Sequence, residues 1–106
     1  MHARTILEQW IDKALTPEEV KEYMDARVFV MDPLIRDQQQ ICEVCFDLYL
    51  WATKQADGYS LIDAIVENDL KEAMGCCSDA MRHGGLWAVM VFLYNCAPRG
   101  WNKKED

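Results

Sequence analysis

The stretch DPLIRDQQQICEVCFDLYLWATKQADG, residues 32–58, decides the predicted fold. Asp32 and Pro33 are typical of a helix start, since Asp accepts hydrogen bonds from the first amides and Pro fits the first helical position. Gly58 is typical of a helix end, because it adopts the left-handed conformation that closes the last turn. Neither Gly nor Pro interrupts residues 34–57. The sequence therefore predicts one long helix over about 33–56.

This helix changes character along its length. Residues 36–40 are polar on every side, whereas residues 41–52 are apolar over most of the circumference. A helix that is apolar nearly all round is enclosed by other helices. Residues 86–96 form a second run of this kind. We therefore predict an all-α fold, a compact bundle of five or six helices around a central helix and an apolar C-terminal helix.

The remaining helices are predicted from apolar periodicity and capping signals. Residues 4–15 carry an apolar stripe at i, i+3 and i+4 spacing. Thr16, Pro17 and Glu19 form a capping box that begins a second helix, which extends to about Arg27. Ser60 is the expected cap of another helix. Asn68 and Asp69 are typical of a break or a new helix cap, and the helical pattern continues over 70–81. Residues 1–98 are expected to be one helical domain, followed by a short charged tail over 99–106.

Composition limits the classes of function. The 106 residues include 18 acidic and 11 basic side chains, a net charge of −7. This balance disfavours direct nucleic-acid binding, which depends on Lys and Arg at phosphates, and favours a protein partner with a basic surface. No apolar run is long enough to span a bilayer, and no signal-peptide core follows Met1. We expect a cytoplasmic protein whose five cysteines are free thiols.

The cysteines also suggest a metal site as an alternative. Cys42 and Cys45 form a C-x-x-C pair, and Cys76, Cys77 and His83 are further candidate ligands for a tetrahedral zinc ion. The pair lies inside a strongly helical apolar run, however, and reduced Cys is a common core residue. The structural interpretation is therefore preferred, and neither a bound metal nor a cofactor is expected.

No catalytic motif is present. The chain has no phosphate-binding loop, no Rossmann glycine pattern, no His-Glu-x-x-His and no nucleophile elbow. His83 suits the negative end of a helix better than it suits a general base. The sequence therefore predicts a protein that is not an enzyme, although a small metal-dependent enzyme that uses Cys42 and Cys45 remains an alternative.

The preferred hypothesis is a small acidic binding module, most simply an inhibitor that occupies a basic surface of a nuclease or other nucleic-acid-processing protein. Small acidic helical proteins of this size are frequent among bacteriocin immunity proteins, antitoxins and phage inhibitors of host defence, including anti-CRISPR proteins, and the analogy is one of class alone. The alternative is a homo-oligomeric structural or adaptor protein, such as a homodimer, that uses its surplus of Met and Trp. The expected contact residues are Glu43, Asp47, Asp63, Glu67, Asp69 and Glu72, with Trp101 as a possible anchor.

Overall fold

The computed structural model describes residues 5–78, 81 and 84–103. Every element in these ranges is helical, which confirms the predicted all-α class. The elements are α1 (Ile6–Ile11), α2 (Pro17–Met24), the π-helical segment η1 (Asp25–Phe29), α3 (Gln38–Ala52), α4 (Ser60–Val66), α5 (Leu70–Cys76) and α7 (Gly85–Cys96).

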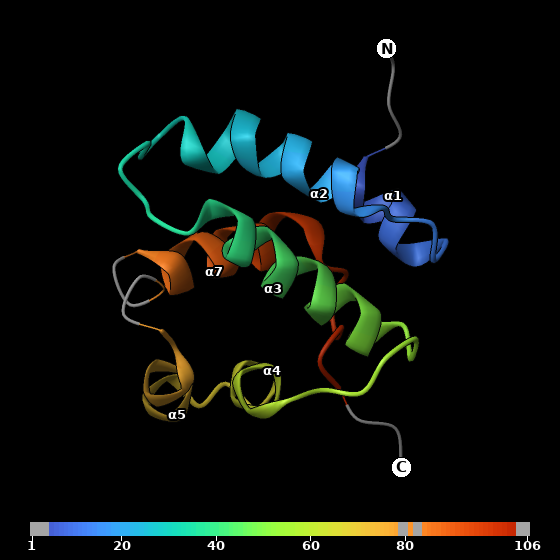
Figure 1. Cartoon of the computed structure of the whole chain (residues 1–106). Coiled ribbons are helices and arrows are strands. Elements are labelled where there is room, and N and C mark those ends of the chain that lie inside the picture. The colour runs from blue at the N-terminus through green and yellow to red at the C-terminus, as the bar shows by residue number, and fades with distance from the viewer. Residues whose placement is uncertain (1–4, 79–80, 82–83, 104–106) are drawn as a thin grey trace.

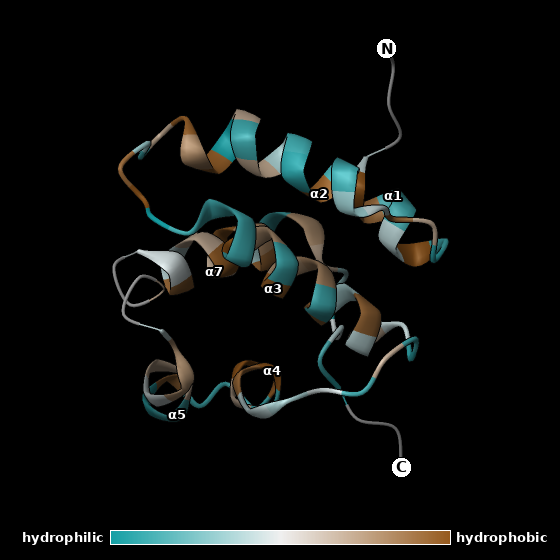
Figure 2. Cartoon of the chain, in the orientation of Figure 1, coloured by the Kyte–Doolittle hydropathy of each residue, from teal (hydrophilic) through white to brown (hydrophobic). Residues whose placement is uncertain are grey.

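The helices lie in three layers (Figure 1). The upper layer contains α1, α2 and η1, the middle layer contains α3 and α7, and the lower layer contains α4 and α5. The radius of gyration is 13.2 Å, as expected for a compact chain of this length. The apolar residues of α2 and α4 face the middle layer (Figure 2). Helix α3 therefore lies at the centre of the bundle, as predicted.

Helix α3 begins later than the predicted position 33. Asp32 and Pro33 instead form a turn, in which the Ile35 amide donates to the Asp32 carbonyl at 3.2 Å and the Leu34 amide to the Asp32 carboxylate at 3.3 Å. Asp followed by Pro is as favourable in a β-turn as at a helix start. The buried side chain of Ile35 then points into the core. Asp37 follows in the left-handed conformation, with φ of 55°, and α3 begins only at the next residue, Gln38.

Three helices end at residues that are not glycine. Lys13, Lys54 and Asn68 follow α1, α3 and α4 in the left-handed conformation, with φ between 59° and 63°. In each case this residue and the next donate to carbonyls three and five positions back, at 2.8–3.1 Å, as in a Schellman motif. The predicted ends at residues 15 and 56 were therefore too late. The first lies just before the Thr16 and Pro17 signal for the next helix, and the second just before Gly58.

The capping predictions have mixed outcomes. The box of Thr16 and Glu19 is present, and Asp69 accepts from the Glu72 amide at 3.1 Å to begin α5. Ser60 is not the cap of α4, because Tyr59 occupies that position without a side-chain bond. Helix α5 ends at Cys76, since Cys77 is extended. His83, which was predicted to stand at the end of a helix, lies outside the described residues.

The core is built around α3 and α7, whose apolar character was predicted. Tyr49 and Phe92 are almost completely buried, and the Trp10 ring lies against both, with ring centroids 5.5 and 6.1 Å away. The aromatic cluster therefore joins the upper layer to the middle layer. Among the described residues, no helix combines the length and the apolarity that a membrane span requires.

Candidate binding surface on helix α3

A groove separates α2 and η1 from α3, and we call it the α2–α3 groove. Its volume is about 610 Å³. The apolar part of its lining includes Phe29, Cys42 and Phe46. The charged part consists of three carboxylates and one ammonium group, which belong to Asp25, Glu43, Asp47 and Lys21. Lys21 is already bound to Asp25 in an ion pair, so the remaining charge of the groove is that of the two α3 acids.

A second groove of about 310 Å³ lies on the other side of α3, next to the start of α4. Glu43 and Asp47 line this α3–α4 groove as well, together with Tyr59 and Cys76. The two carboxylates therefore stand on a ridge between two hollows, which we call the α3 ridge. Their spacing of four residues places them on one face of the helix. This is the first pair of contact residues that the sequence predicted.

Hydrogen bonds hold the ridge in place. The Tyr59 hydroxyl donates to Asp47 at 2.7 Å, and the Gln39 amide donates to Glu43 at 3.4 Å. Partial burial and the Asp47 carboxylate raise the pKa of Tyr59 above its usual value, so the hydroxyl keeps its proton at neutral pH. Each carboxylate oxygen has more than one lone pair, so both acids can accept further hydrogen bonds from a partner.

The other predicted acids lie elsewhere. Asp63 and Glu67 of α4 line a separate hollow of about 400 Å³ beside Trp51. Asp69 is engaged as the cap of α5. Glu72 accepts from the Cys76 thiol at 3.8 Å, and Cys76 lines the α3–α4 groove. The structure thus brings Glu43 and Asp47 to one groove, leaves Glu72 in contact with a residue that lines it, and does not gather all six acids.

Trp101, the predicted anchor, is half-buried. Its ring packs edge-on against Trp10 and Trp51, with centroids 6.3 and 6.4 Å away. The neighbouring Asn102 amide donates to the Val66 carbonyl at 3.0 Å. These contacts hold the described part of the tail on the bundle. A role of Trp101 in partner binding stays a prediction.

The thiols are arranged as core residues. Burial raises the pKa of Cys42 and of Cys96 to about 11, and it raises that of fully buried Cys45 well above the usual value. Protonated thiols are poor metal ligands and poor nucleophiles. Within residues 5–78, 81 and 84–103, no group of three or more His, Cys, Asp or Glu side chains is arranged to hold a metal ion.

Sequence reasoning missed the apolar side of the surface. Phe46 was predicted only as part of the enclosed apolar run over residues 41–52, Phe29 was not considered as a binding residue, and neither was the Lys21–Asp25 ion pair. The pairing of α2 with α3 creates the groove, and no local pattern in one sequence encodes which helices become neighbours. The π-helical turn of η1, which adjoins this groove, also has no sequence signal of its own.

Comparison of the chain with protein-family models, with curated proteins and with solved structures finds no match.

Proposed function

We propose that the chain is a protein-binding module whose α3 ridge binds a basic, amphipathic segment of a partner protein. The supporting observation is that the same two carboxylates, Glu43 and Asp47, line both grooves beside the central helix. A partner that fills either groove therefore meets both charges. The free thiols also favour a reducing, cytoplasmic location.

The α2–α3 groove combines two kinds of recognition. Apolar side chains of a partner helix would bury themselves against the half-buried Cys42 and Phe46, as in other helix-in-groove complexes. Lys or Arg side chains of the same helix would reach Glu43 and Asp47 at the ridge. The net charge of −7 would speed the encounter with a basic partner. An inhibitor that covers the basic surface of a nuclease or related protein would act in this way.

The test uses a synthetic amphipathic helical peptide of Leu and Lys as the probe, and a counterpart with Glu in place of Lys. Isotope-labelled protein is titrated with each peptide and followed by NMR. We expect the Lys peptide to shift the amide signals of Gln39, Cys42 and Phe46, with an affinity that falls steeply as salt is added. The Glu peptide should leave these signals unchanged.

A matched pair of double variants separates the ridge from overall charge. Glu43→Gln with Asp47→Asn removes the two ridge charges, and Glu18→Gln with Asp57→Asn removes two exposed acids that line none of the three grooves described above. The ridge variant should bind the Lys peptide about tenfold more weakly than the unchanged protein does, because each of the two charge contacts contributes about 0.7 kcal/mol to binding. The proposal would be contradicted if both double variants lost the same amount of affinity for the Lys peptide, or if that affinity did not depend on salt.

A further inference from the structure

Helix α7 has an apolar face that the other described helices leave open. Trp87 and Tyr94 are 49% and 90% exposed, and Met90 and Val91 between them are partly exposed. These four residues stand at i, i+3, i+4 and i+7, so they form one line along the helix, which we call the α7 stripe. The opposite side of α7 contributes to the core. The bundle therefore does not enclose α7 completely, although its sequence is apolar on every side.

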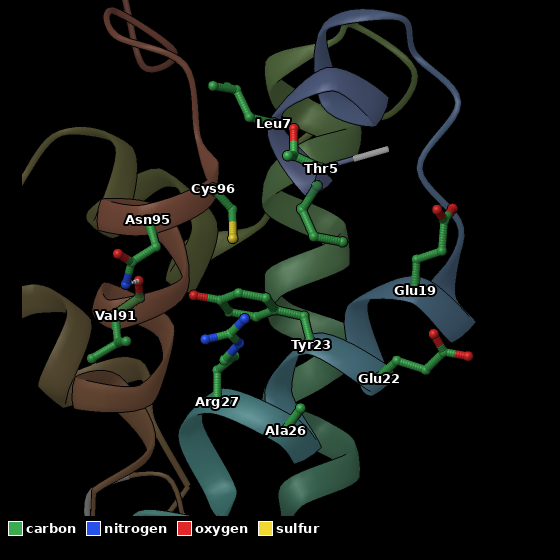
Figure 3. A pocket seen from close by; sticks show the side chains of 11 residues that line it. Thr5, Leu7, Glu19, Glu22, Tyr23, Ala26, Arg27, Val91, Asn95 and Cys96 are labelled. Atoms are coloured by element: carbon green, nitrogen blue, oxygen red, sulfur yellow. Dashed lines mark hydrogen bonds between the residues drawn. The ribbon is translucent and has the colours of Figure 1, made fainter. Parts of the chain in front are cut away.

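The α7 stripe is separate from the α3 ridge. Helix α7 lies behind α3 in the middle layer (Figure 1), and none of the four side chains lines the α2–α3 groove or the α3–α4 groove. Val91 lines a different hollow of about 770 Å³, where Figure 3 shows it beside Asn95 on α7. Leu7 of α1 adds apolar surface to this hollow and is itself 38% exposed. The charged residues of the hollow belong to α2 and η1 and not to α7.

The α7 stripe differs in charge from the rest of the molecule. Among the helices in the described ranges, α7 alone contains no Asp, Glu, Lys or Arg. Two copies of a chain with a net charge of −7 repel each other, and this repulsion is smallest where the facing surfaces contain no acids. A basic partner, in contrast, would gain no charge contact at the stripe. The charge distribution therefore favours a second copy of this chain as the molecule that covers α7.

The order of side chains in the α7 stripe also suits a second copy. Aromatic side chains stand at both ends, and smaller apolar side chains stand at the centre. If two α7 helices paired in antiparallel orientation about a two-fold axis between Met90 and Val91, Trp87 of each copy would meet Tyr94 of the other. A two-fold interface requires this self-complementarity, because the same patch serves both copies. Within the described part of the chain, no aromatic ring packs against Trp87 or Tyr94.

We propose that the chain forms a two-fold symmetric dimer in which the two α7 stripes pack against each other in antiparallel orientation. An aromatic side chain buries about 150–250 Å², so the exposed parts of Trp87 and Tyr94 offer about 300 Å² per copy. Interfaces of standard size bury about 800 Å² per partner. The dimer should therefore be weak and reversible, and it should dissociate on dilution.

Sedimentation equilibrium of the full chain tests this proposal, under reducing conditions that prevent disulfide-linked dimers. We expect the mass to rise from that of a monomer to that of a dimer between micromolar and millimolar concentrations. Added salt should strengthen the dimer, because it screens the repulsion between two acidic copies. The salt dependence at the α3 ridge has the opposite sign, so the two surfaces succeed or fail separately.

Substitutions in the α7 stripe test the antiparallel pairing. Trp87→Lys and Tyr94→Glu each place a charge in the stripe, and a symmetric dimer contains each change twice. Each variant should therefore dimerise at least about tenfold more weakly than the unchanged protein. In a mixture of the two variants, one contact becomes an ion pair and the other keeps Trp87 against Tyr94, so the mixed dimer should be tighter than either variant's own dimer. Leu34→Glu is the matched control, because it charges an apolar side chain that is 86% exposed and lies outside α7. It should leave the dimer unchanged.

Three results would overturn the proposal. A chain that stays monomeric at millimolar concentration would mean that something other than a second copy covers the stripe. An equal loss of dimer in Tyr94→Glu and Leu34→Glu would place the interface elsewhere. A mixture that associates no better than the separate variants would exclude the contact between Trp87 and Tyr94. Far-ultraviolet circular dichroism verifies that the variants fold, and the comparison of Tyr94→Glu with Leu34→Glu still decides the result if Trp87→Lys does not.

Discussion

Tyr49 offers the sharpest test of how the layers are joined. Its side chain is 1% exposed, and its hydroxyl oxygen accepts from the buried Leu15 amide and from the Gln55 side chain, each at 3.2 Å. Tyr49→Phe removes this acceptor and changes little else. Gln55 keeps a second partner in the Thr53 hydroxyl at 2.8 Å. The Leu15 amide has no other hydrogen-bond acceptor in the described part of the chain, so it becomes a buried donor without a partner.

The expected loss follows from this geometry. A buried donor left without a partner costs about 1–3 kcal/mol, so we expect Tyr49→Phe to lower the free energy of unfolding by about 2 kcal/mol. Urea denaturation measures this loss, which should appear as a lower midpoint at an unchanged slope. Tyr94→Phe is the matched control, because it deletes the same atom from a side chain that is 90% exposed. It should change the stability by less than about 0.5 kcal/mol.

Hydrogen exchange gives an independent measurement at the same position. The Leu15 amide should exchange faster in Tyr49→Phe than the lower stability alone explains, since its own acceptor is gone. A loss of stability below about 0.5 kcal/mol together with unchanged protection of the Leu15 amide would refute this role of Tyr49. Such a result would mean that the Leu15 amide finds another partner or water.

Three further predictions concern turns, caps and thiols. Lys13→Gly should be more stable than Lys13→Ala by about 0.5–1 kcal/mol in urea denaturation, because only Gly relieves the left-handed strain. Thr16→Ala should cost about 1 kcal/mol by the same assay through loss of the capping box. Stability should fall as pH rises from 9 to 11, since the unfolded chain then releases the Cys42 and Cys96 protons that the fold retains. In Cys42→Ser the free energy of unfolding should depend less on pH over this range.

Helix identity could be predicted because the signals for it are local. Helix α7 matches the apolar run over residues 86–96 almost to the residue. The Thr16 and Glu19 capping box is also local, since its two residues lie three positions apart and bind each other. Each of these depends on interactions within one or two helical turns. A single sequence contains all the information that such interactions require.

Helix ends were predicted less well because two conformations compete closely there. Lys in the left-handed conformation costs about 1–2 kcal/mol, yet the Schellman hydrogen bonds and the burial of Leu15 just beyond α1 outweigh this cost. Asp32 and Pro33 likewise suit a turn and a helix start about equally. The choice between them depends on where Ile35 packs, which is a tertiary contact. Positions of this kind require the fold before their conformation can be assigned.

The α3 ridge shows how the binding surface follows from the packing of the core. Ile41, Val44 and Leu48 bury the other faces of α3, so the stripe that contains Gln39 and Glu43 is the part of the helix that remains open. Carboxylates cannot be buried without large desolvation costs, so the acids themselves determine which face stays uncovered. A side chain on such a tightly packed helix is held more precisely than one on a loop. The charge that excludes neighbouring helices from this face is therefore the same charge that would select a basic partner.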